Sequence, residues 1–345
     1  MRREILLIGN FFVSTGGRQV CQDLADHLRD LGWSVHTTSA HQPRGRRLLD
    51  MLWTVWRVRR RYAVALIDVF SGPSFVWAAL CARLLHWLGK PYLLALRGGN
   101  LPQYAQRHPG RVRRLLGQAS AVTTPSRYLQ QALAPYRPDM ILLPNPIELR
   151  HYPFIQRTAP RPRLVWLRAF MAHYNPCLAA DVVAALREDY PDIRLIMIGP
   201  DKRDGTWHAF HQQVQALALA NHVEQPGAIP KGAVPAWLQR GDIFLNTTNV
   251  DNTPVSVLEA LACGLVVIST DVGGMPYLLS HEHDALLVPP QDPTRMAEAV
   301  RRVIEAPALA AQLSWNGRRT AEAFDWQSVR AQWDHLLTEV QGKTA

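Results

Sequence analysis

The sequence predicts an α/β protein made of two doubly wound domains, each with a parallel sheet between helices. Short apolar segments alternate with helical segments along most of the chain, which is typical of strand–helix–strand units. The length of 345 residues and a hydrophobic fraction of 48% suffice for two cores. A segment with repeated Pro that runs through Arg163 indicates a linker between domains at 1–150 and 161–320.

The first domain is expected to contain six strands and five helices. The strands are predicted at Glu4–Ile8, Trp33–Thr37, Ala63–Val69, Tyr92–Leu96, Ala121–Thr123 and Met140–Leu143. The helices are predicted at Gly17–Leu31, Leu48–Arg60, Phe75–Leu88, Arg111–Gly117 and Arg127–Leu133. Ligands of such sheets bind beyond the carboxyl ends of the strands, so the loops that follow strands are the first candidate sites.

Two glycine-containing loops follow strands of this domain. The loop after the first strand contains Gly16 and Gly17 but has neither the dinucleotide fingerprint nor a P-loop, and an ordinary strand-to-helix turn is the alternative. In the loop after the fourth strand, a Gly pair allows close approach of the backbone to a ligand. Arg97 and Asn100 flank that pair and are candidate contacts, with a simple loop and helix cap as the alternative.

The segment 44–62 is rich in Arg and contains two Trp. At helical spacing its apolar residues share one face, formed by Leu49, Leu52, Trp53 and Trp56. One interpretation packs this face on the sheet and leaves the arginines in water. The other places Trp and Leu at a membrane interface, with Arg on anionic headgroups, and Arg107–Arg114 could extend that basic surface.

The second domain is predicted to begin with a strand at Arg163–Leu167, directly followed by Arg168. A guanidinium at the carboxyl end of a strand is a good phosphate ligand, because it can bind two oxygens at once. His173 lies five residues further on and could donate a hydrogen bond, although a structural role is the alternative. The remaining elements are helices at Leu178–Arg187, His211–Ala220, Pro293–Glu305 and Trp326–Val340 and strands at Arg194–Ile198 and Val223–Gln225.

The segment from Phe244 to Pro276 reads as strand, loop, helix, strand and turn. Thr253 is predicted to cap the helix, Pro254 to occupy its first position and Gly264 to end it. The inward face of this helix is expected to consist of Val255, Leu258, Leu261 and Ala262.

Two carboxylates accompany this helix. Asp251 lies in the loop before it, and Glu259 lies more than a turn inside, with its side chain leaning back toward the helix start. The free amides of a helix start form a seat for phosphate. Carboxylates beside such a seat repel phosphate but suit the hydroxyl groups of an attached ribose and sugar. Alternatively, Glu259 is a solvated helix residue and Asp251 only makes a turn.

The order and spacing of these residues resemble the signature of retaining glycosyltransferases of family 4, which have the GT-B fold. The matching features are an acidic pair eight residues apart, Glu259-Ala260-Leu261-Ala262-Cys263-Gly264, an apolar strand and the turn Gly273-Gly274. The first acid of the family is usually Glu, whereas this chain has Asp251. The resemblance implies two Rossmann-like domains facing an interdomain cleft, with the last helical stretch crossing back to the first domain.

The resemblance also implies roles for the candidate residues. Arg168 would bind the donor diphosphate, together with His173 at a position where the family commonly has Lys. Amides near Asn252, Thr253, Pro254 and Val255 would bind the same phosphates, Asp251 the sugar hydroxyls and Glu259 the ribose. The donor base would pack near Ile229 and Lys231, while Gly16 and Gly17 would face the cleft near the donor phosphate or the acceptor. Arg97 and Asn100 stand where the family often places a His near the donor sugar.

The implied activity is retaining transfer of a sugar from a nucleotide-sugar to a glycan or lipid-linked acceptor, in cell-envelope or exopolysaccharide biosynthesis. No metal or cofactor beyond the donor is expected, because Arg168 and the helix start can supply positive charge. The alternatives are a noncatalytic sugar-nucleotide-binding protein and another GT-B enzyme such as a sugar-nucleotide epimerase.

Charge and composition indicate the partners. The formal net charge of +10 and a pI near 9.8 favour an anionic partner, such as a nucleotide-sugar or an anionic membrane surface, whereas no nucleic-acid-binding module is recognisable. Cys21, Cys81, Cys177 and Cys263 are scattered, so buried free thiols are expected. Without a signal-peptide core or a membrane span, the expected location is the cytoplasm, including the inner face of the membrane.

Overall fold

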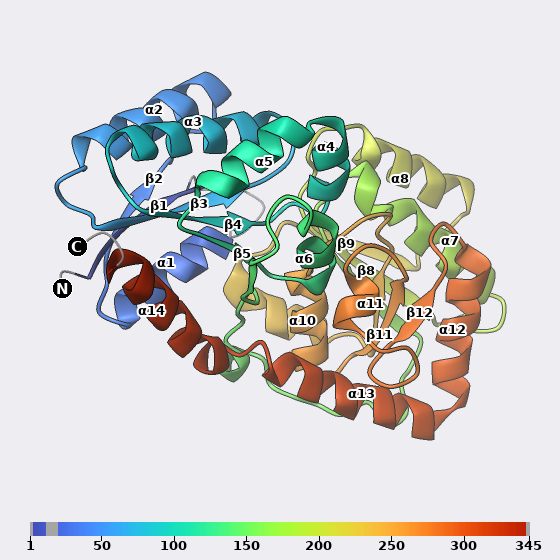
Figure 1. Ribbon diagram of the computed structural model, residues 1–345. Helices are drawn as coiled ribbons and strands as arrows, with labels where there is room; N and C mark the ends of the chain where they lie inside the picture. The colour runs from blue at the N-terminus through green and yellow to red at the C-terminus, as the bar shows by residue number, and fades with distance from the viewer. Residues whose placement is uncertain (1–2, 12–19, 343–345) are drawn as a thin grey trace. The chain divides into compact units, whose positions relative to one another are not determined.

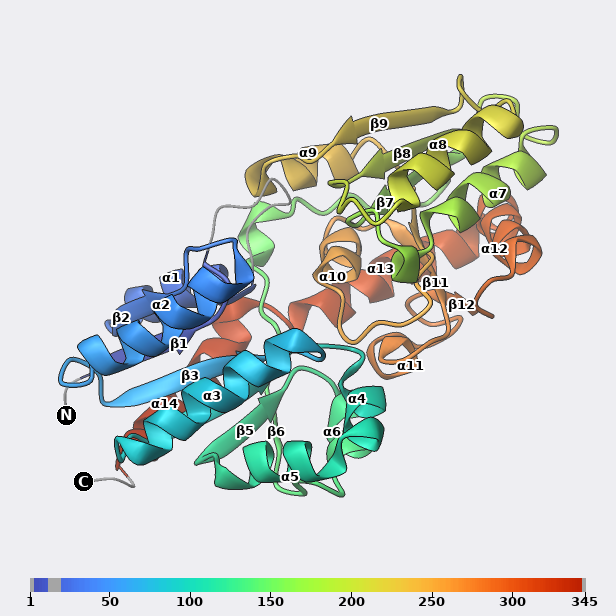
Figure 2. The same ribbon diagram turned by 90° about the horizontal axis from the view of Figure 1, so that it is seen from above.

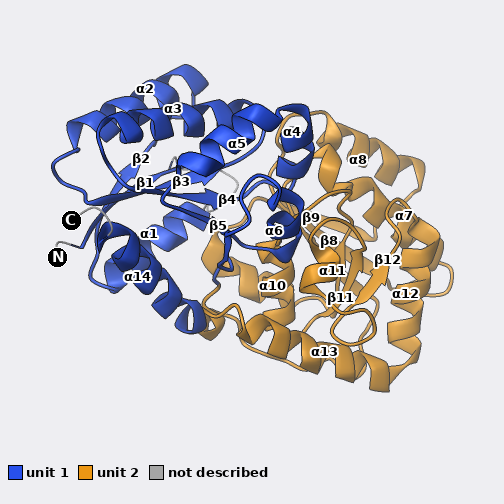
Figure 3. Ribbon diagram, viewed as in Figure 1, with its two compact units in different colours: residues 1–14, 18–146, 326–345 blue, residues 15–17, 147–325 orange. Residues whose placement is uncertain are grey.

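The computed structural model describes residues 3–11 and 20–342 (Figure 1). The chain divides into two compact units (Figure 3). Unit 1 extends to Pro146 and resumes at Trp326, and unit 2 contains residues 147–325. Each unit contains a six-stranded parallel sheet flanked by helices, so the predicted fold of two doubly wound α/β domains is confirmed.

The sheet of unit 1 has the strand order β2-β1-β3-β4-β5-β6. With β1 between β2 and β3, this is the order of flavodoxin-like sheets rather than the dinucleotide-binding order. The strands are β1 (Glu4–Ile8), β2 (Ser34–Thr38), β3 (Val64–Val69), β4 (Tyr92–Leu96), β5 (Ala121–Thr124) and β6 (Ile141–Leu142). Each lies within about one residue of its predicted position.

Helices cover both faces of this sheet (Figure 1). One face packs against α2 (Arg44–Arg57), α3 (Pro73–Trp87), α4 (Leu101–Arg107), α5 (Pro109–Gln118) and α6 (Arg127–Leu133). The other packs against α1 (Val20–Asp30) and α14 (Trp326–Gly342). Trp326 and Trp333 of α14 are buried there with Ile5 and Leu7 of β1, which places the last helix in unit 1.

The interpretation that packs the Trp residues of α2 on the sheet is wrong. Trp53 is 56% exposed and Trp56 is 41% exposed, and their rings stack with centroids 5.3 Å apart. The buried face contains Met51 and Val55 together with the polar Arg47. Arg47 is tolerated inside because its guanidinium donates to the His41 carbonyl oxygen at 2.9 Å and to Asn10 Oδ1 at 3.1 Å.

The sheet of unit 2 has the order β12-β11-β10-β7-β8-β9. Numbered within the unit, this is the dinucleotide-binding order, and the direction of winding reverses between β7 and β10. The strands are β7 (Arg163–Leu167), β8 (Arg194–Ile198), β9 (Val223–Gly227), β10 (Ile243–Asn246), β11 (Val266–Thr270) and β12 (Leu286–Val288). The carboxyl ends of β7 and β10 therefore mark the place where ligands of such sheets bind.

The helices of unit 2 include one that the sequence did not predict, α13 (Pro307–Glu322). It contacts α10 (Val255–Ala262), whose residues from Ser256 to Ala262 are all buried. The prediction of a single inward face on α10 is therefore wrong, because the sheet and α13 enclose the helix. The other helices are α7 (Pro176–Leu186), α8 (Thr206–Ala216), α9 (Val234–Leu238), α11 (Met275–Leu278) and α12 (Pro293–Glu305).

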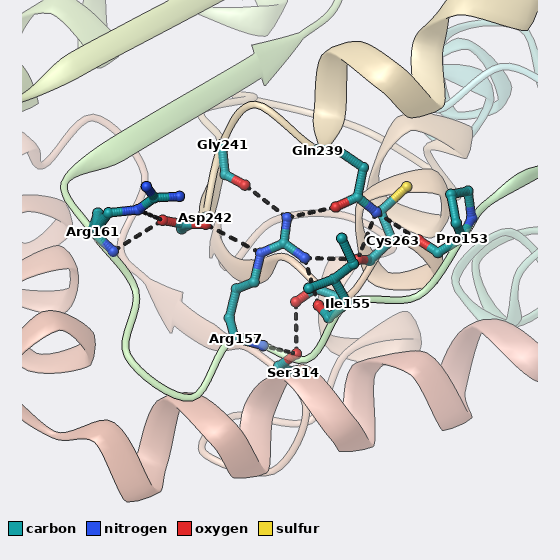
Figure 4. A network of polar contacts seen from close by, with 10 residues as sticks. Pro153, Ile155, Arg157, Arg161, Gln239, Gly241, Asp242, Cys263 and Ser314 are labelled. Carbon is teal, nitrogen blue, oxygen red and sulfur yellow. Dashed lines mark hydrogen bonds and ion pairs between the residues drawn. The ribbon is translucent and has the colours of Figure 1, made fainter.

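The Pro-rich segment expected as a linker packs inside unit 2 through Arg157, which is 5% exposed (Figure 4). The guanidinium donates to Asp242 Oδ1 at 3.2 Å and to the carbonyl oxygen of Gly241 at 2.9 Å. It also donates to Gln239 Oε1 and to the carbonyl oxygen of Cys263. One buried side chain thus joins the segment to the residues before β10 and after α10.

Replacing Arg157 by Met should destabilise unit 2 strongly, since it leaves Asp242 and several carbonyl oxygens without their buried donor. Breaking a buried pair from one side costs about 3–5 kcal/mol, and the melting temperature of a unit of this size should fall by on the order of 10 °C. The matched control is Arg161→Met, because Arg161 pairs with the same carboxylate while its side chain is 60% exposed. Its cost should stay below about 1 kcal/mol. Equal melting shifts in the two variants would contradict this account.

Candidate functional site

An ion pair joins the two central strands of unit 2 at their carboxyl ends. Arg168 directly follows β7, and Asp251 lies in the loop that follows β10, the neighbouring strand. The guanidinium of Arg168 donates to Asp251 Oδ2, and each side chain is 14% exposed. The pair therefore stands at the topological switch point of the sheet, where the fold predicts a ligand.

Two glycines hold the backbones of this pair in place. A Cβ on Gly199 would lie 1.7 Å from the carbonyl oxygen of Arg168, and φ at Gly199 is +149°. A Cβ on Gly274 would lie 1.8 Å from the carbonyl oxygen of Asn252, next to Asp251. The Gly274 amide also donates to the Asp251 carbonyl oxygen at 3.0 Å. The Gly-Gly turn thus fixes the loop that carries the acid, because no larger residue leaves room for it.

Aromatic and histidine side chains surround Arg168. The centroid of the Tyr174 ring lies 4.5 Å from the guanidinium carbon, a cation–π contact. The Tyr174 and His173 rings have centroids 3.9 Å apart and are tilted by 51°. The His173 carbonyl oxygen accepts from the Asn249 amide at 2.8 Å, which ties this segment to the loop after β10. Burial lowers the pKa of His173 below its ordinary 6.5, and Arg168 adds to this while Asp251 opposes it. His173 is therefore a neutral imidazole at pH 7, not a cation.

The start of α10 lies directly after Asp251. The helix begins at Val255 with Pro254 as the N-cap residue, so the predicted cap at Thr253 is one position early. The first intrahelical bond runs from the Val257 amide to the Pro254 carbonyl oxygen. Asn252, Thr253 and Pro254 are buried, and Val255 is half-buried. Gly264 ends the helix region as predicted.

Glu259 has a separate set of partners. It is 5% exposed, and its Oε1 accepts from the Tyr152 hydroxyl at 2.6 Å. Lys231 Nζ lies 3.9 Å from the same oxygen. The interpretation of Glu259 as a solvated helix residue is wrong. The structure brings the predicted Lys231 and Glu259 together, whereas Asp251 pairs with Arg168 in a second group.

Tyr152 was missed by the sequence reasoning. It lies just after the short 3-10 helix Leu149–His151, in the stretch interpreted as the domain junction. A single Tyr among Pro and basic residues carries no pattern that points to a buried carboxylate. Its partner lies 107 positions away in the chain, so only the folded structure reveals the contact.

Among the described residues, no hydrogen bond or ion pair joins Arg97, Asn100 or Ile229 to these two groups. Arg97 belongs to unit 1, where its guanidinium pairs with Asp68 at 3.0 Å and donates to Asn145, and its side chain is 6% exposed. Asn100 is exposed at the N-cap of α4 and makes no side-chain capping bond. Gly16 and Gly17 lie outside the described residues. Ile229 packs half-buried against the core of unit 2 close to Lys231 in sequence.

Several buried polar atoms of this region have no hydrogen-bond partner among the described residues. They are Arg168 Nε, Asn249 Oδ1 and Ser256 Oγ. All three belong to the segments that follow β7 and β10 or begin α10. Buried polar groups are almost always satisfied in folded proteins, which makes these three atoms candidates for hydrogen bonds to a bound ligand. Among the residues that the structure describes, no cluster of three or more His, Cys, Asp or Glu could hold a metal ion.

Comparison with known proteins confirms the predicted family resemblance over unit 2. Residues 155–320 match the family model "Glycosyl transferases group 1". The chain is 27% identical over 170 residues to D-inositol 3-phosphate glycosyltransferase of Jonesia denitrificans, covering 48% of this chain and 38% of that protein. It is 23% identical over 272 residues to the protein of the same name from Streptomyces avermitilis. That match covers 73% of this chain and 59% of that protein. The chain thus spans between about two fifths and three fifths of the length of these relatives.

Solved structures show the same fold. Sucrose-phosphate synthase from Thermosynechococcus elongatus matches with a TM-score of 0.82 at 18% identity, covering 99% of this chain and 100% of that one. Anabaena Alr3699/HepE in complex with UDP-glucose matches with a TM-score of 0.78 at 17% identity, covering 97% and 99%. At such identities the likeness establishes the GT-B fold of two Rossmann-like domains.

The stability of unit 2 should depend on pH through His173. Its folded-state pKa is lowered, so the unfolded chain binds more protons just below pH 6.5. The stabilisation that comes from the neutral imidazole is complete above pH 6.5 and is lost as pH falls through the window between 6.5 and the folded pKa. His173→Gln should therefore flatten the loss of melting temperature between pH 7.5 and 5, whereas the exposed His208→Gln should not. Parallel profiles for wild type and His173→Gln would contradict the assignment.

Proposed function

We propose that this chain is a retaining glycosyltransferase that moves a sugar from a nucleotide-sugar to a glycan or lipid-linked acceptor. The proposal starts from the match of residues 155–320 to group 1 glycosyltransferases. The observation that carries it is Arg168 at the switch point of unit 2, held beside the start of α10 with its Nε unsatisfied among the described residues.

The donor diphosphate is proposed to bind Arg168 and the amides near Asn252–Val255. A helix start offers free N–H groups and partial positive charge, and the guanidinium adds a full charge with several donors. Asp251 holds Arg168 in position before the donor arrives, and the unsatisfied Nε remains for a phosphate oxygen. His173, neutral at pH 7, contributes a hydrogen bond rather than a charge.

The two carboxylates are proposed to bind hydroxyl groups of the donor. Asp251 Oδ1 accepts from the Asn252 amide at 2.8 Å while Oδ2 bonds Arg168, so the carboxylate is oriented on both sides and can still accept from sugar hydroxyls. Glu259 is held by Tyr152 and Lys231 and is assigned to the ribose. Ile229 and Lys231 are assigned to the base. Titration of Glu259→Gln with the donor nucleotide tests the ribose assignment, and unchanged affinity would remove it.

The reaction requires one bond to break and one to form. The bond between the anomeric carbon and the diphosphate oxygen breaks, and its electron pair leaves with the diphosphate, next to Arg168. The acceptor oxygen bonds the anomeric carbon on the same face, and its proton passes to the departing diphosphate, which gives retention. We expect no metal requirement, because Arg168 and the helix start offset the developing charge. Loss of turnover after treatment with a chelator would contradict that expectation.

A noncatalytic sugar-nucleotide-binding protein is the second candidate. It is favoured by the ion pair itself, since Asp251 neutralises the charge that a leaving diphosphate would need. A sugar-nucleotide epimerase is the third. A panel of nucleotide-sugars that begins with UDP-glucose, the ligand in one solved structure of this fold, separates them. Nucleotide release with sugar transfer to cell-membrane extract supports the transferase, an altered free sugar-nucleotide supports the epimerase, and binding without turnover supports the noncatalytic protein.

Arg168→Ala should abolish most of the turnover with the donor that this panel identifies. Removing one charged donor from a developing anion costs on the order of 2–4 kcal/mol, or about two or more decades of rate. Arg168→Lys keeps the charge but not the two-point contact and should recover only part of that loss. A loss below threefold in Arg168→Ala would show that another group carries the charge.

The acceptor side is proposed to include contact with an anionic membrane surface through α2, at the cytoplasmic face. Leu49, Trp53 and Trp56 are exposed on one side of this helix, and the Arg59 guanidinium lies 4.3 Å from the Trp56 ring centroid. Exposed Trp with adjacent Arg is typical of interfacial helices. None of the described helices is long and apolar enough to cross a bilayer, so this contact would be peripheral.

Trp53→Ala should weaken binding to anionic vesicles while leaving the fold intact. Because the side chain is more than half exposed, the melting temperature should change little, unlike the about 3–5 kcal/mol lost when a core Trp is truncated. Flotation with phosphatidylglycerol vesicles at low and high salt measures the binding, which salt should weaken. Val55→Ala on the buried face is the matched control and should lower the melting temperature instead. Failure of wild-type protein to float at low salt would end this proposal.

A further inference from the structure

The net positive charge of this chain comes from unit 1. Residues 1–146 and 326–345 contain 22 Arg and Lys against 9 Asp and Glu, a formal charge of +13. Residues 147–325 contain 16 against 19, a formal charge of −3. The unit that carries the proposed donor site is therefore slightly acidic overall. The basic surplus therefore lies outside the unit that contains Arg168, Asp251 and Glu259.

Within unit 1, the surplus is concentrated on one helical layer. Residues 69–138 contain nine Arg and Lys and no Asp or Glu, and they include α3, α4, α5 and α6. These helices and α2 lie on one face of the sheet, opposite α1 and α14 (Figures 1 and 2). Asp68, the last acid before this stretch, is buried in its pair with Arg97. Nothing within 69–138 therefore neutralises the exposed arginines of this layer.

A groove of about 390 Å³ lies in the same layer between α3 and α5, with α4 at one side. Its apolar lining includes Phe75 and Leu80 of α3, Tyr104 of α4 and Leu115 of α5. The Phe75 and Tyr104 rings pack with centroids 4.7 Å apart. The volume falls within the range of small-molecule sites, roughly 300–1,000 Å³.

Three exposed arginines line this groove together with its apolar residues. They are Arg83 of α3 and Arg111 and Arg114 of α5. No ion pair joins any of the three to a carboxylate of the described residues. Arginines without a counter-ion beside an apolar groove are complementary to a molecule with an anionic head and a hydrocarbon tail.

We propose that the groove between α3 and α5 binds one anionic phospholipid from the membrane, with its acyl chain against Phe75, Leu80 and Leu115 and its phosphate on Arg83, Arg111 and Arg114. α3 contacts α2, whose exposed Trp53 and Trp56 are proposed above to enter the interface. The lipid site adds a specific contact with one lipid phosphate to the nonspecific membrane contact proposed for α2. It builds on the proposed membrane contact of α2 but requires neither donor binding nor turnover.

The test uses the full chain and short-chain lipids below their critical micelle concentration. Calorimetric titration with dihexanoyl phosphatidylglycerol should show saturable one-site binding. Glycerol 3-phosphate has the charge without the chains, and dihexanoyl phosphatidylcholine has the chains without the net charge. Each should bind at least tenfold more weakly.

Two variants locate the site. Arg83→Gln combined with Arg114→Gln should weaken phosphatidylglycerol binding at least tenfold, whereas Arg29→Gln combined with Arg330→Gln should not. The control pair removes the same charge from α1 and α14 on the opposite face of unit 1. Ala79→Trp should also abolish binding, because it fills the groove without changing charge. Melting temperatures and nucleotide binding confirm that each variant is folded.

Four results would overturn the proposal. Equal binding of glycerol 3-phosphate would assign the arginines to a soluble anion. Binding of a single-stranded oligonucleotide that is lost in Arg83→Gln with Arg114→Gln, without any lipid binding, would assign them to nucleic acid. Unchanged lipid binding in Ala79→Trp would place the lipid elsewhere. Flotation of wild-type protein without one-site lipid binding leaves the α2 contact standing and rejects the groove, so the two proposals fail separately.

Discussion

The Arg168–Asp251 ion pair is the constraint on which the arrangement of unit 2 depends. It links the carboxyl ends of β7 and β10, the two strands between which the sheet reverses its winding. Gly199 and Gly274 are required because the backbones beside these two residues leave no room for a Cβ. Each side chain is only 14% exposed, so the two charges have lost much of their water and their electrostatic interaction is stronger than that of an exposed pair.

In the proposed donor site, this ion pair would allow an acid to stand beside the amides that bind phosphate. A free carboxylate would repel a diphosphate, but Asp251 already shares its charge with Arg168. Arg168 Nε is buried and has no hydrogen-bond partner among the described residues, and the proposal assigns it to a phosphate oxygen that binds while the pair stays intact. In the proposed function, the Asp251 carboxylate orients Arg168 and uses its remaining acceptor capacity for sugar hydroxyls. The second carboxylate, Glu259, is isolated from this exchange by Tyr152 and Lys231.

The sequence predicted the fold and the strand positions because parallel strands and their helices leave strong local patterns. The same local patterns placed Arg168 and Asp251 after strands and Glu259 within the helix that follows. The sequence did not predict that Arg168 pairs with Asp251 or that Tyr152 contacts Glu259. These partners are distant in the chain and meet only through tertiary packing. The roles assigned to these residues from the family resemblance stay predictions, and Gly16 and Gly17 lie outside the described residues.

The error on α2 shows where periodicity fails. One of the two interpretations of this helix placed the face with Trp53 and Trp56 inward, yet the structure turns Arg47, Met51 and Val55 inward. Arg47 can be buried because loop carbonyl oxygens and Asn10 satisfy its guanidinium, which no periodic pattern records. The face with Trp53 and Trp56 is then left on the protein surface. It lies on the same helical layer as residues 69–138, which contain no Asp or Glu. An apolar stripe that a protein does not bury in its own core has to be stabilised by its surroundings. The proposed contact with an anionic membrane surface would cover the apolar stripe and offset the positive charge of this layer.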